Sequence, residues 1–168
     1  MSDSESLTHF DEQGRARMVD VGAKPATQRT AVASATIKMG SRTAELIRNR
    51  ELSKGDVIEV ARIAGIMAVK QTPNLIPMCH SIHVDSVNVE FDFSDSTTLD
   101  IVATVTALDR TGVEMEALTS ASVSALTVYD MCKSVDREMV VQQIRLEKKT
   151  GGKSGDFERA PTARNETG

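Results

Sequence analysis

The segment 129–133 contains an acid and a base at a spacing that suits a helix. Residues three apart on a helix lie on the same face, so Asp130 and Lys133 are predicted to be neighbours. In a partly buried position each charge shifts the pKa of the other, and the two form an acid–base couple. On an exposed face the same pair is a surface ion pair of little energetic consequence. The spacing alone leaves both interpretations open.

The segment 77–83 brings together Met78, Cys79, His80 and a second histidine. A Cys and a His this close could contribute to a metal site. A closed zinc site, however, needs four ligands, usually in spaced pairs, and the only other thiol, that of Cys132, has no His nearby. We therefore predict no metal site. His80 is expected either to face a ligand from a loop or to be a hydrogen-bonded structural histidine.

Two carboxylates and a methionine follow Gly112 as Glu114, Met115 and Glu116. In an extended segment Glu114 and Glu116 would share a face and could grip a polar ligand, whereas on a helix they would point to nearly opposite sides. Acidic residues are also common at a helix start, where they offset the macrodipole. The pattern by itself favours this ordinary helix start.

The segment 151–155 has the letters GGKSG, which are similar to a phosphate-binding loop. The full motif requires a glycine at position 147, where this chain has Glu147, and a helix after the loop. A glycine-rich backbone with Lys153 could still hold a phosphate through its N–H groups. The alternative is a mobile tail.

Hydrophobic periodicity predicts the elements that position these residues. Period-2 alternation predicts strands, and period-3.6 alternation predicts helices. Asp56 and Glu59 have the spacing of a capping box and mark one helix start. The predicted strands are 28–39, 87–93, 99–107 and 139–148, and the predicted helices are 43–49, 57–71 and 116–134. A proline-containing loop, 72–77, is expected to end the second helix.

This order of elements predicts an α+β protein with the βαββαβ arrangement of ferredoxin-like folds. The antiparallel sheet is expected to carry helices on one face and to meet water or another subunit with the other. The C-terminal helix is rich in small residues and is therefore expected to pack very close to a neighbouring element. We predict an N-terminal arm at 1–27, a ferredoxin-like catalytic domain at 28–149 and a mobile C-terminal tail at 150–168.

Composition limits the classes of function. The chain has 168 residues, with 40% hydrophobic and 26% charged residues, which is typical of one globular domain. A net charge of −4 argues against nucleic acid or an anionic membrane as partner. No apolar run is long enough to span a bilayer. Two cysteines are too few for a disulfide framework, so we expect free thiols and a cytoplasmic location.

The segments above, with others along the chain, resemble the cyclic pyranopterin monophosphate synthase (MoaC) family of molybdenum cofactor biosynthesis. The resemblance covers residues 7–157. The matching stretches are 8–11, 18–21, 54–56, 61–66, 75–80, 111–119, 129–133 and 151–157. In this order and at these spacings they are highly specific. Two positions depart from the family pattern, because Met78 replaces an expected Leu and Ser81 an expected Pro.

The resemblance implies roles for the matching residues. Asp130 would be the catalytic carboxylate, and Lys54 and Lys133 its acid–base and charge-stabilising partners. The residues implied to line the substrate pocket are Met78, Cys79, His80, Glu114, Met115 and Glu116. Those implied to hold the triphosphate are Arg29, Lys70 and Lys153.

The family is a lyase family that converts 3′,8-cyclo-7,8-dihydroguanosine triphosphate to cyclic pyranopterin monophosphate and pyrophosphate. Rebuilding a purine as a pterin needs proton transfers, which a Lys–Asp–Lys cluster can supply. The resemblance also implies a homohexamer, arranged as a trimer of dimers with active sites at subunit interfaces. It implies no resident metal or other cofactor and leaves open whether Mg²⁺ accompanies the triphosphate.

Two other classes of protein share parts of this pattern. A non-catalytic oligomeric module that binds a nucleotide or pterin would keep the pocket but would not need Lys54, Asp130 and Lys133 together. A ferredoxin-like RNA-binding domain would want aromatic residues on its sheet and a basic surface. An aromatic content of 3% and a net charge of −4 disfavour the second class.

Overall fold

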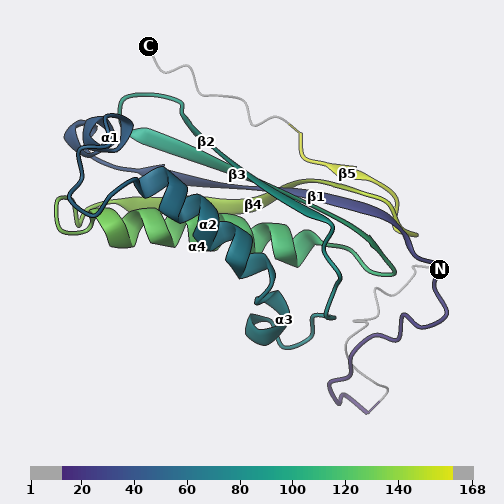
Figure 1. Cartoon of the computed structure of the whole chain (residues 1–168). Coiled ribbons are helices and arrows are strands. Elements are labelled where there is room, and N and C mark those ends of the chain that lie inside the picture. Colours follow the sequence, from purple (N-terminus) through teal and green to yellow (C-terminus); the bar gives the residue numbers. More distant parts are fainter. Residues whose placement is uncertain (1–12, 161–168) are drawn as a thin grey trace.

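The computed structural model describes residues 13–160 as one sheet with helices packed on it (Figure 1). The elements, in chain order, are β1 (Thr27–Lys38), α1 (Ser41–Arg48), α2 (Val57–Val69), α3 (Thr72–Leu75), β2 (Ser86–Phe93), β3 (Thr98–Asp109), α4 (Glu114–Cys132), β4 (Val140–Thr150) and β5 (Phe157–Glu158). None of the helices in this part of the chain has the length and apolar character that crossing a bilayer requires.

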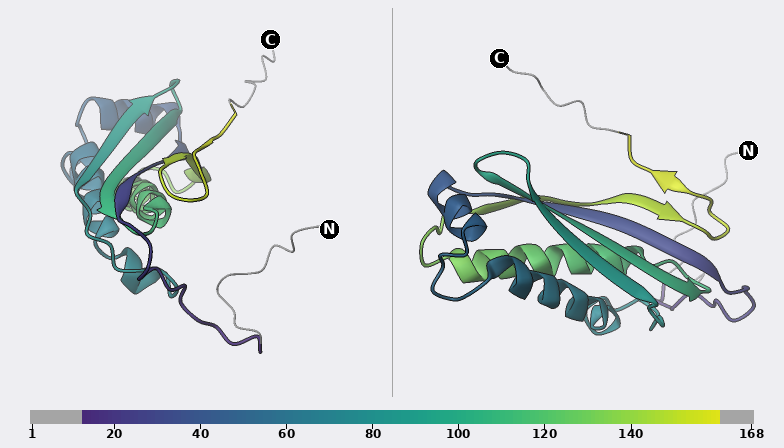
Figure 2. Two further views of the ribbon diagram at one scale, coloured as in Figure 1. Left: turned by 90° about the vertical axis from the view of Figure 1, so that its right-hand side faces the viewer. Right: turned by 45° about the horizontal axis from the view of Figure 1, so that its top comes forward.

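The sheet has the strand order β2-β3-β1-β4-β5, and every neighbouring pair is antiparallel. The first four strands and the helices between them form the predicted βαββαβ ferredoxin-like arrangement. Figure 2 shows α2 and α4 on the same face of the sheet. The opposite face is not covered by a helix of residues 13–160. The prediction of a sheet with helices on one face is therefore confirmed.

Small aliphatic residues make up much of the interface between β1 and α4. Ala31, Ala33 and Ala35 of β1 are completely buried, as are three alanines of α4 that recur every four residues. Those of α4 are Ala117, Ala121 and Ala125. Short side chains allow a helix to approach a sheet closely. The axis of α4 is thereby held against the middle of the sheet.

Gly65 of α2 packs directly against α4. A Cβ atom added to Gly65 would lie 3.2 Å from the backbone oxygen of Ser120 and even closer to the hydroxyl of Ser124. The Ser124 hydroxyl also donates a hydrogen bond to the carbonyl oxygen of Ala61, at 3.2 Å. The close packing predicted from the small residues of the C-terminal helix is confirmed at this contact.

Several predicted boundaries need correction. Helix α4 begins at Glu114, two residues before the predicted start, so Glu114 and Glu116 both lie in its first turn. The predicted loop 72–77 contains the short helix α3, because a proline is tolerated in the first turn of a helix. At the start of α2, the side chain of Asp56 accepts a hydrogen bond from the N–H of Glu59, as its spacing predicts.

The C-terminal segment is more structured than predicted. Strand β4 continues to Thr150, and β5 folds back so that Lys148 and Lys149 pair with Glu158 and Phe157. The prediction of a mobile tail from residue 150 is therefore wrong for the hairpin that ends at Glu158. Residues 161–168, and residues 1–12 of the predicted arm, lie outside the described residues.

We expect Gly65→Ala to lower the free energy of unfolding by about 1–3 kcal/mol, because the added methyl group overpacks the contact between α2 and α4. Urea denaturation followed by circular dichroism would measure the change. Gly65→Ala combined with Ser124→Ala, which removes the nearest atom, should recover part of the loss. An unchanged unfolding free energy in the single variant would show that the helices separate without cost.

Candidate active site

A cavity of about 340 Å³ lies beside the loop that carries Met78, Cys79 and His80. We call it the Cys–His cavity. Its other walls come from the N-terminal arm, from a further residue of the same loop, and from the start of α4 with the residues just before it. They are Val19, Val21, Lys24, Ile82, Thr111, Gly112, Glu114 and Met115. The predicted pocket residues Met78, Cys79, His80, Glu114 and Met115 therefore do share one cavity.

His80 is fixed by the arm. Its Nε2 lies 2.8 Å from the carbonyl oxygen of Val19. A carbonyl can only accept, so Nε2 carries the hydrogen and donates it. In neutral imidazole this leaves Nδ1 as an acceptor. His80 is thus a hydrogen-bonded structural histidine, and it also lines the cavity. Both roles that the sequence left open for it are therefore present.

The thiol of Cys79 is unsuited to act as a nucleophile. Partial burial raises its pKa, and the neighbouring carboxylates of Glu116 and Glu114 raise it further. The thiolate is the reactive form of cysteine, so a raised pKa keeps the group inert near neutral pH. Cys79 therefore contributes shape and weak polarity to the cavity.

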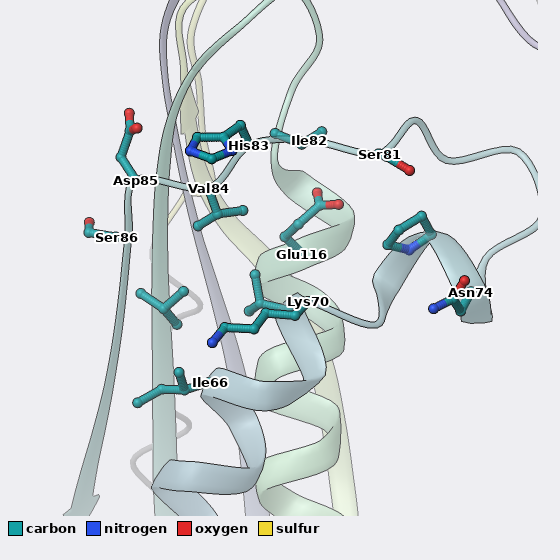
Figure 3. A pocket seen from close by; sticks show the side chains of 13 residues that line it. Ile66, Lys70, Asn74, Ser81, Ile82, His83, Val84, Asp85, Ser86 and Glu116 are labelled. Atoms are coloured by element: carbon teal, nitrogen blue, oxygen red, sulfur yellow. The ribbon is translucent and has the colours of Figure 1, made fainter.

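Glu116 lies on the other side of residues 78–82, where a second cavity of about 610 Å³ opens between α2, α3 and β2 (Figure 3). We call it the Glu116 cavity. Glu116 is only 1% exposed, and neither carboxylate oxygen has a hydrogen-bond partner among the described residues. Burial, followed by the charges of Glu114 and Asp109, raises its pKa to about 7. A protonated carboxyl group here can both donate and accept.

Lys70 also lines the Glu116 cavity, and it is separate from the two other residues implied to hold the triphosphate. In Figure 3 its ammonium group and the Glu116 carboxylate point in different directions. Arg29 and Lys153 instead lie together in a third cavity.

This third cavity, of about 410 Å³, is strongly basic. Its cationic side chains come from the arm, β1, the loop after β3, and the hairpin of β4 and β5. They are Lys24, Arg29, Arg110, Lys149 and Lys153. We call it the basic cavity. It shares Thr111, Gly112 and Glu114 with the Cys–His cavity, so the two adjoin. Such a cluster can hold a polyphosphate.

Arg29 is locked in place at the floor of the basic cavity. Its guanidinium donates to the carbonyl oxygens of Asp109 and Arg110, both at 3.3 Å. Gly152 has a φ of 86° and lies so close to this guanidinium that a Cβ atom there would overlap it. The glycines of segment 151–155 thus permit a left-handed turn and the close approach of Arg29.

The remaining implied residues, Lys54, Asp130 and Lys133, lie at the opposite end of α4 from the cavities. Lys133 Nζ donates to the carboxylate of Asp130. Lys54 Nζ donates to the backbone carbonyl oxygen of Asp130, at 3.0 Å. We call these three residues the Lys–Asp–Lys cluster. Lys133 holds the pKa of Asp130 below its usual value, mainly through this hydrogen bond. The Asp130 and Lys133 side chains are 63% and 51% exposed, so the pair is well solvated.

The cluster is far from the cavities within one chain. Glu116 and Asp130 lie on one continuous helix, and fourteen residues at 1.5 Å each separate them by about 21 Å. The structure therefore gathers the implied residues in two groups, one at each end of α4. No single protomer brings the cluster to the cavities.

Comparison with known proteins identifies the family of this chain. The model of the MoaC family matches residues 18–152. The chain belongs to the MoaC family. A cyclic pyranopterin monophosphate synthase of Brevibacillus brevis is 54% identical over 93% of this chain and 98% of its own length. One of Desulfitobacterium hafniense is 54% identical over 90% of this chain and 93% of its own. Cyclic pyranopterin monophosphate synthase 3 of Mycobacterium bovis is 55% identical over 91% of this chain and 86% of its own.

The structure of this MoaC-family chain adds residues that the sequence did not single out. Lys24, Arg110 and Lys149 complete the basic cavity. Lys149 carried a weak signal, since it precedes segment 151–155 in an alternating strand, whereas nothing in the sequence marked Lys24. Within residues 13–160, no three His, Cys, Asp or Glu side chains gather in a way that could hold a metal ion.

We expect the stability of this chain to depend on pH through Glu116. In the folded chain the Glu116 carboxyl group has a pKa of about 7, whereas its ordinary pKa is 4.5. Between these two pH values the folded chain therefore binds more protons than the unfolded chain. Stability is therefore lost as the pH rises through this window. Glu116→Gln removes the ionisation, so its unfolding free energy relative to wild type should increase by up to about 3 kcal/mol from pH 4.5 to about pH 8.

Urea denaturation of both proteins across this pH range would measure the difference. Glu114→Gln is the matched control, because it removes a carboxylate from the same turn that is only partly buried. A difference between Glu116→Gln and wild type that does not change with pH would contradict a buried, protonated Glu116.

Proposed function

We propose that this protein is a cyclic pyranopterin monophosphate synthase of molybdenum cofactor biosynthesis. It would convert (8S)-3′,8-cyclo-7,8-dihydroguanosine 5′-triphosphate to cyclic pyranopterin monophosphate and diphosphate. The observation that carries the proposal is that one chain holds an acid–base cluster at one end of α4 and, at the other end, a polar cavity that adjoins a basic one. Membership of the MoaC family and relatives bearing this name support it.

The basic cavity suits the triphosphate. Arg29 and Lys153 were implied for this role, and the structure adds Arg110 and Lys149 around them. Closing the cyclic phosphate expels diphosphate, and fixed cations stabilise the charge on that leaving group. Lys149 is held near the turn by its hydrogen bond to the hydroxyl of Ser154, at 2.5 Å. Mg²⁺ bound to the triphosphate would add to the same stabilisation.

The ring system would occupy the Cys–His cavity and reach towards the Glu116 cavity. Glu114 offers a carboxylate that accepts hydrogen bonds from the N–H groups of a guanine-like edge. Glu116 can hold a proton at neutral pH and offer it to a ring nitrogen or oxygen. Lys70 and His80 complete the polar lining.

The Lys–Asp–Lys cluster would transfer protons. Asp130 is the catalytic carboxylate, and Lys54 and Lys133 are its acid–base and charge-stabilising partners. In one protomer this cluster is exposed, so water screens the charges and limits the change in pKa. Covering the cluster with another polar surface would strengthen the mutual effect of the charges. Catalysis therefore calls for a second surface over the end of α4.

That second surface would be another copy of the chain. Each protomer supplies a cluster at one end of α4 and cavities at the other, so pairing two copies head to tail completes two sites. Helix α2 also presents an exposed apolar stripe, Val60, Ile63 and Met67, which are 43%, 57% and 60% exposed. Apolar stripes of this kind are typical of surfaces covered by a partner. We propose a homohexamer, a trimer of dimers, in the cytoplasm.

The activity is tested by adding the cyclised GTP substrate to the purified protein and measuring diphosphate and oxidisable pterin. We expect both products from wild type. Asp130→Asn should keep the assembly and substrate binding but lower kcat by at least about a hundredfold, because it removes the proton-transferring carboxylate. A folded, assembled wild type without product would contradict the proposed activity, and an active Asp130→Asn would contradict the role of this carboxylate.

Mixing subunits tests the shared site. Asp130→Asn damages the cluster half of the shared site, and Glu114→Gln damages the cavity half. Random co-assembly of the two variants should therefore restore about a quarter of the sites. The control mixes Asp130→Asn with Lys133→Ala, which damage the same half and should restore nothing. Restoration in neither mixture would place the complete site within one protomer, and restoration in the control would show that Asp130 and Lys133 of one protomer do not form a single half of the site. Native mass spectrometry of the same samples would count the subunits.

The basic cavity is tested with two neighbouring lysines of β4. Lys149 lines this cavity, whereas Lys148 lies 3.6 Å from Glu158 in an exposed ion pair. We expect Lys149→Gln to raise KM about tenfold, which corresponds to one charge-assisted contact with phosphate. Lys148→Gln should leave KM within about twofold, because exposed ion pairs contribute little. Equal effects of the two substitutions would contradict a specific phosphate site.

A further inference from the structure

Asp136 ties together two segments that are distant in the sequence. It lies in the loop between α4 and β4. One oxygen of its carboxylate accepts hydrogen bonds from the N–H of Gly40, at 2.8 Å, and from the hydroxyl of Thr43, at 3.1 Å. The other oxygen accepts from the N–H of Glu138, at 3.0 Å. This side chain thus organises its own loop and joins it to the start of α1.

This carboxylate takes the place of a missing helix cap. Gly40 occupies the N-cap position of α1 and has no side chain with which to cap it. Asp136 supplies the acceptor from the other end of the chain, and its negative charge also suits the positive end of the helix dipole. The Gly40 hydrogen bond is the main cause of a lowered pKa at Asp136, so the group stays ionised near neutral pH.

The two joined segments carry the Lys–Asp–Lys cluster. Asp130 and Lys133 end α4 just before the loop of Asp136, and Lys54 lies in the connection from α1 to α2. One end of this connection is fixed where α2 packs on α4, and the other end is fixed by α1. The hydrogen bonds within the cluster are exposed and therefore weak. Their geometry depends on how firmly the surrounding backbone is held.

A second bond holds the same loop. The hydroxyl of Tyr129, on α4, donates to the carbonyl oxygen of Arg137, at 3.2 Å. The loop is thereby tied to α4 on one side and, through Asp136, to α1 on the other. We propose that Asp136 is a positioning residue that aligns Lys54 with Asp130 and Lys133 by holding the start of α1 to the end of α4. The effect of this alignment on turnover rests on the proposed function, whereas the alignment itself does not.

Asp136→Ala would be assayed for diphosphate release in the assembled enzyme. We expect kcat to fall about ten- to a hundredfold, because displacing catalytic groups by about 1 Å has costs of this size. KM should stay within about twofold, since Asp136 lines none of the three cavities. Asp136→Asn keeps one acceptor oxygen and should fall between Asp136→Ala and wild type. Thr43→Val, which removes a single bond, gives a milder test if the alanine variant does not fold.

Asp95→Asn is the matched control. Asp95 also organises a turn through three hydrogen bonds, with the N–H and hydroxyl of Thr97 and the hydroxyl of Thr98. It lies in the hairpin between β2 and β3, and these side-chain bonds stay within that turn. Arg48 of α1 donates to the backbone carbonyl oxygen of Asp95, at 2.6 Å, and Asp95→Asn leaves that oxygen in place. We expect a comparable loss of stability with unchanged kcat. If Asp95→Asn lowers kcat as much as Asp136→Asn, the effect is general destabilisation and the proposal is wrong.

The pKa of Asp130 provides a readout that does not depend on turnover. It can be followed by carbon-13 NMR of protein labelled at the aspartate side-chain carboxyl. Removing the negative charge of Asp136 would by itself lower the pKa of Asp130, whereas loss of alignment with Lys54 and Lys133, which both lower this pKa, would raise it. We expect a rise towards the ordinary value in Asp136→Ala. A pKa that falls or stays the same would overturn the positioning role, whether or not the enzyme turns over this substrate.

Discussion

The packing of α4 against the sheet and α2 is the constraint on which the rest of the molecule depends. Alanines at every fourth position of α4 and alternate positions of β1 leave no room for the helix to shift. Gly65 then brings α2 within contact of the α4 backbone. Because both ends of this helix carry polar residues of the site, the alanine and glycine contacts in its middle set the position of each group.

The length of α4 also separates those groups. In the proposed function, the cavities at its N-terminal end hold the ring and the triphosphate, whereas Asp130 and Lys133 lie at its C-terminal end. The cluster at its C-terminal end lacks any cavity of its own among those described. A rigid helix cannot bend to unite the two, so association of copies offers a direct physical solution. An active site assembled in this way would exist only in the oligomer.

The site also contains groups that cost stability. The Glu116 carboxylate is buried with no hydrogen-bond partner among residues 13–160. Gly151 and Gly152 adopt positive φ angles so that Arg29 can lie against the turn. Burying a carboxyl group without hydrogen bonds is unfavourable, and the group remains neutral to limit that cost. Features that oppose folding and yet face cavities are the expected mark of a functional site.

The sequence by itself determined the βαββαβ order, the capped start of α2, the small-residue packing of α4 and the family, because periodicity, capping and motif spacing are local properties. It also placed Asp130 beside Lys133. It could not show that Glu114 and Glu116 face different cavities, or that Lys70 is apart from Arg29 and Lys153. Nor could it identify Lys24, Arg110 and Asp136, whose partners are distant along the chain. Only the tertiary structure decided these points, because they depend on how α4, the arm and the β4–β5 hairpin meet in space.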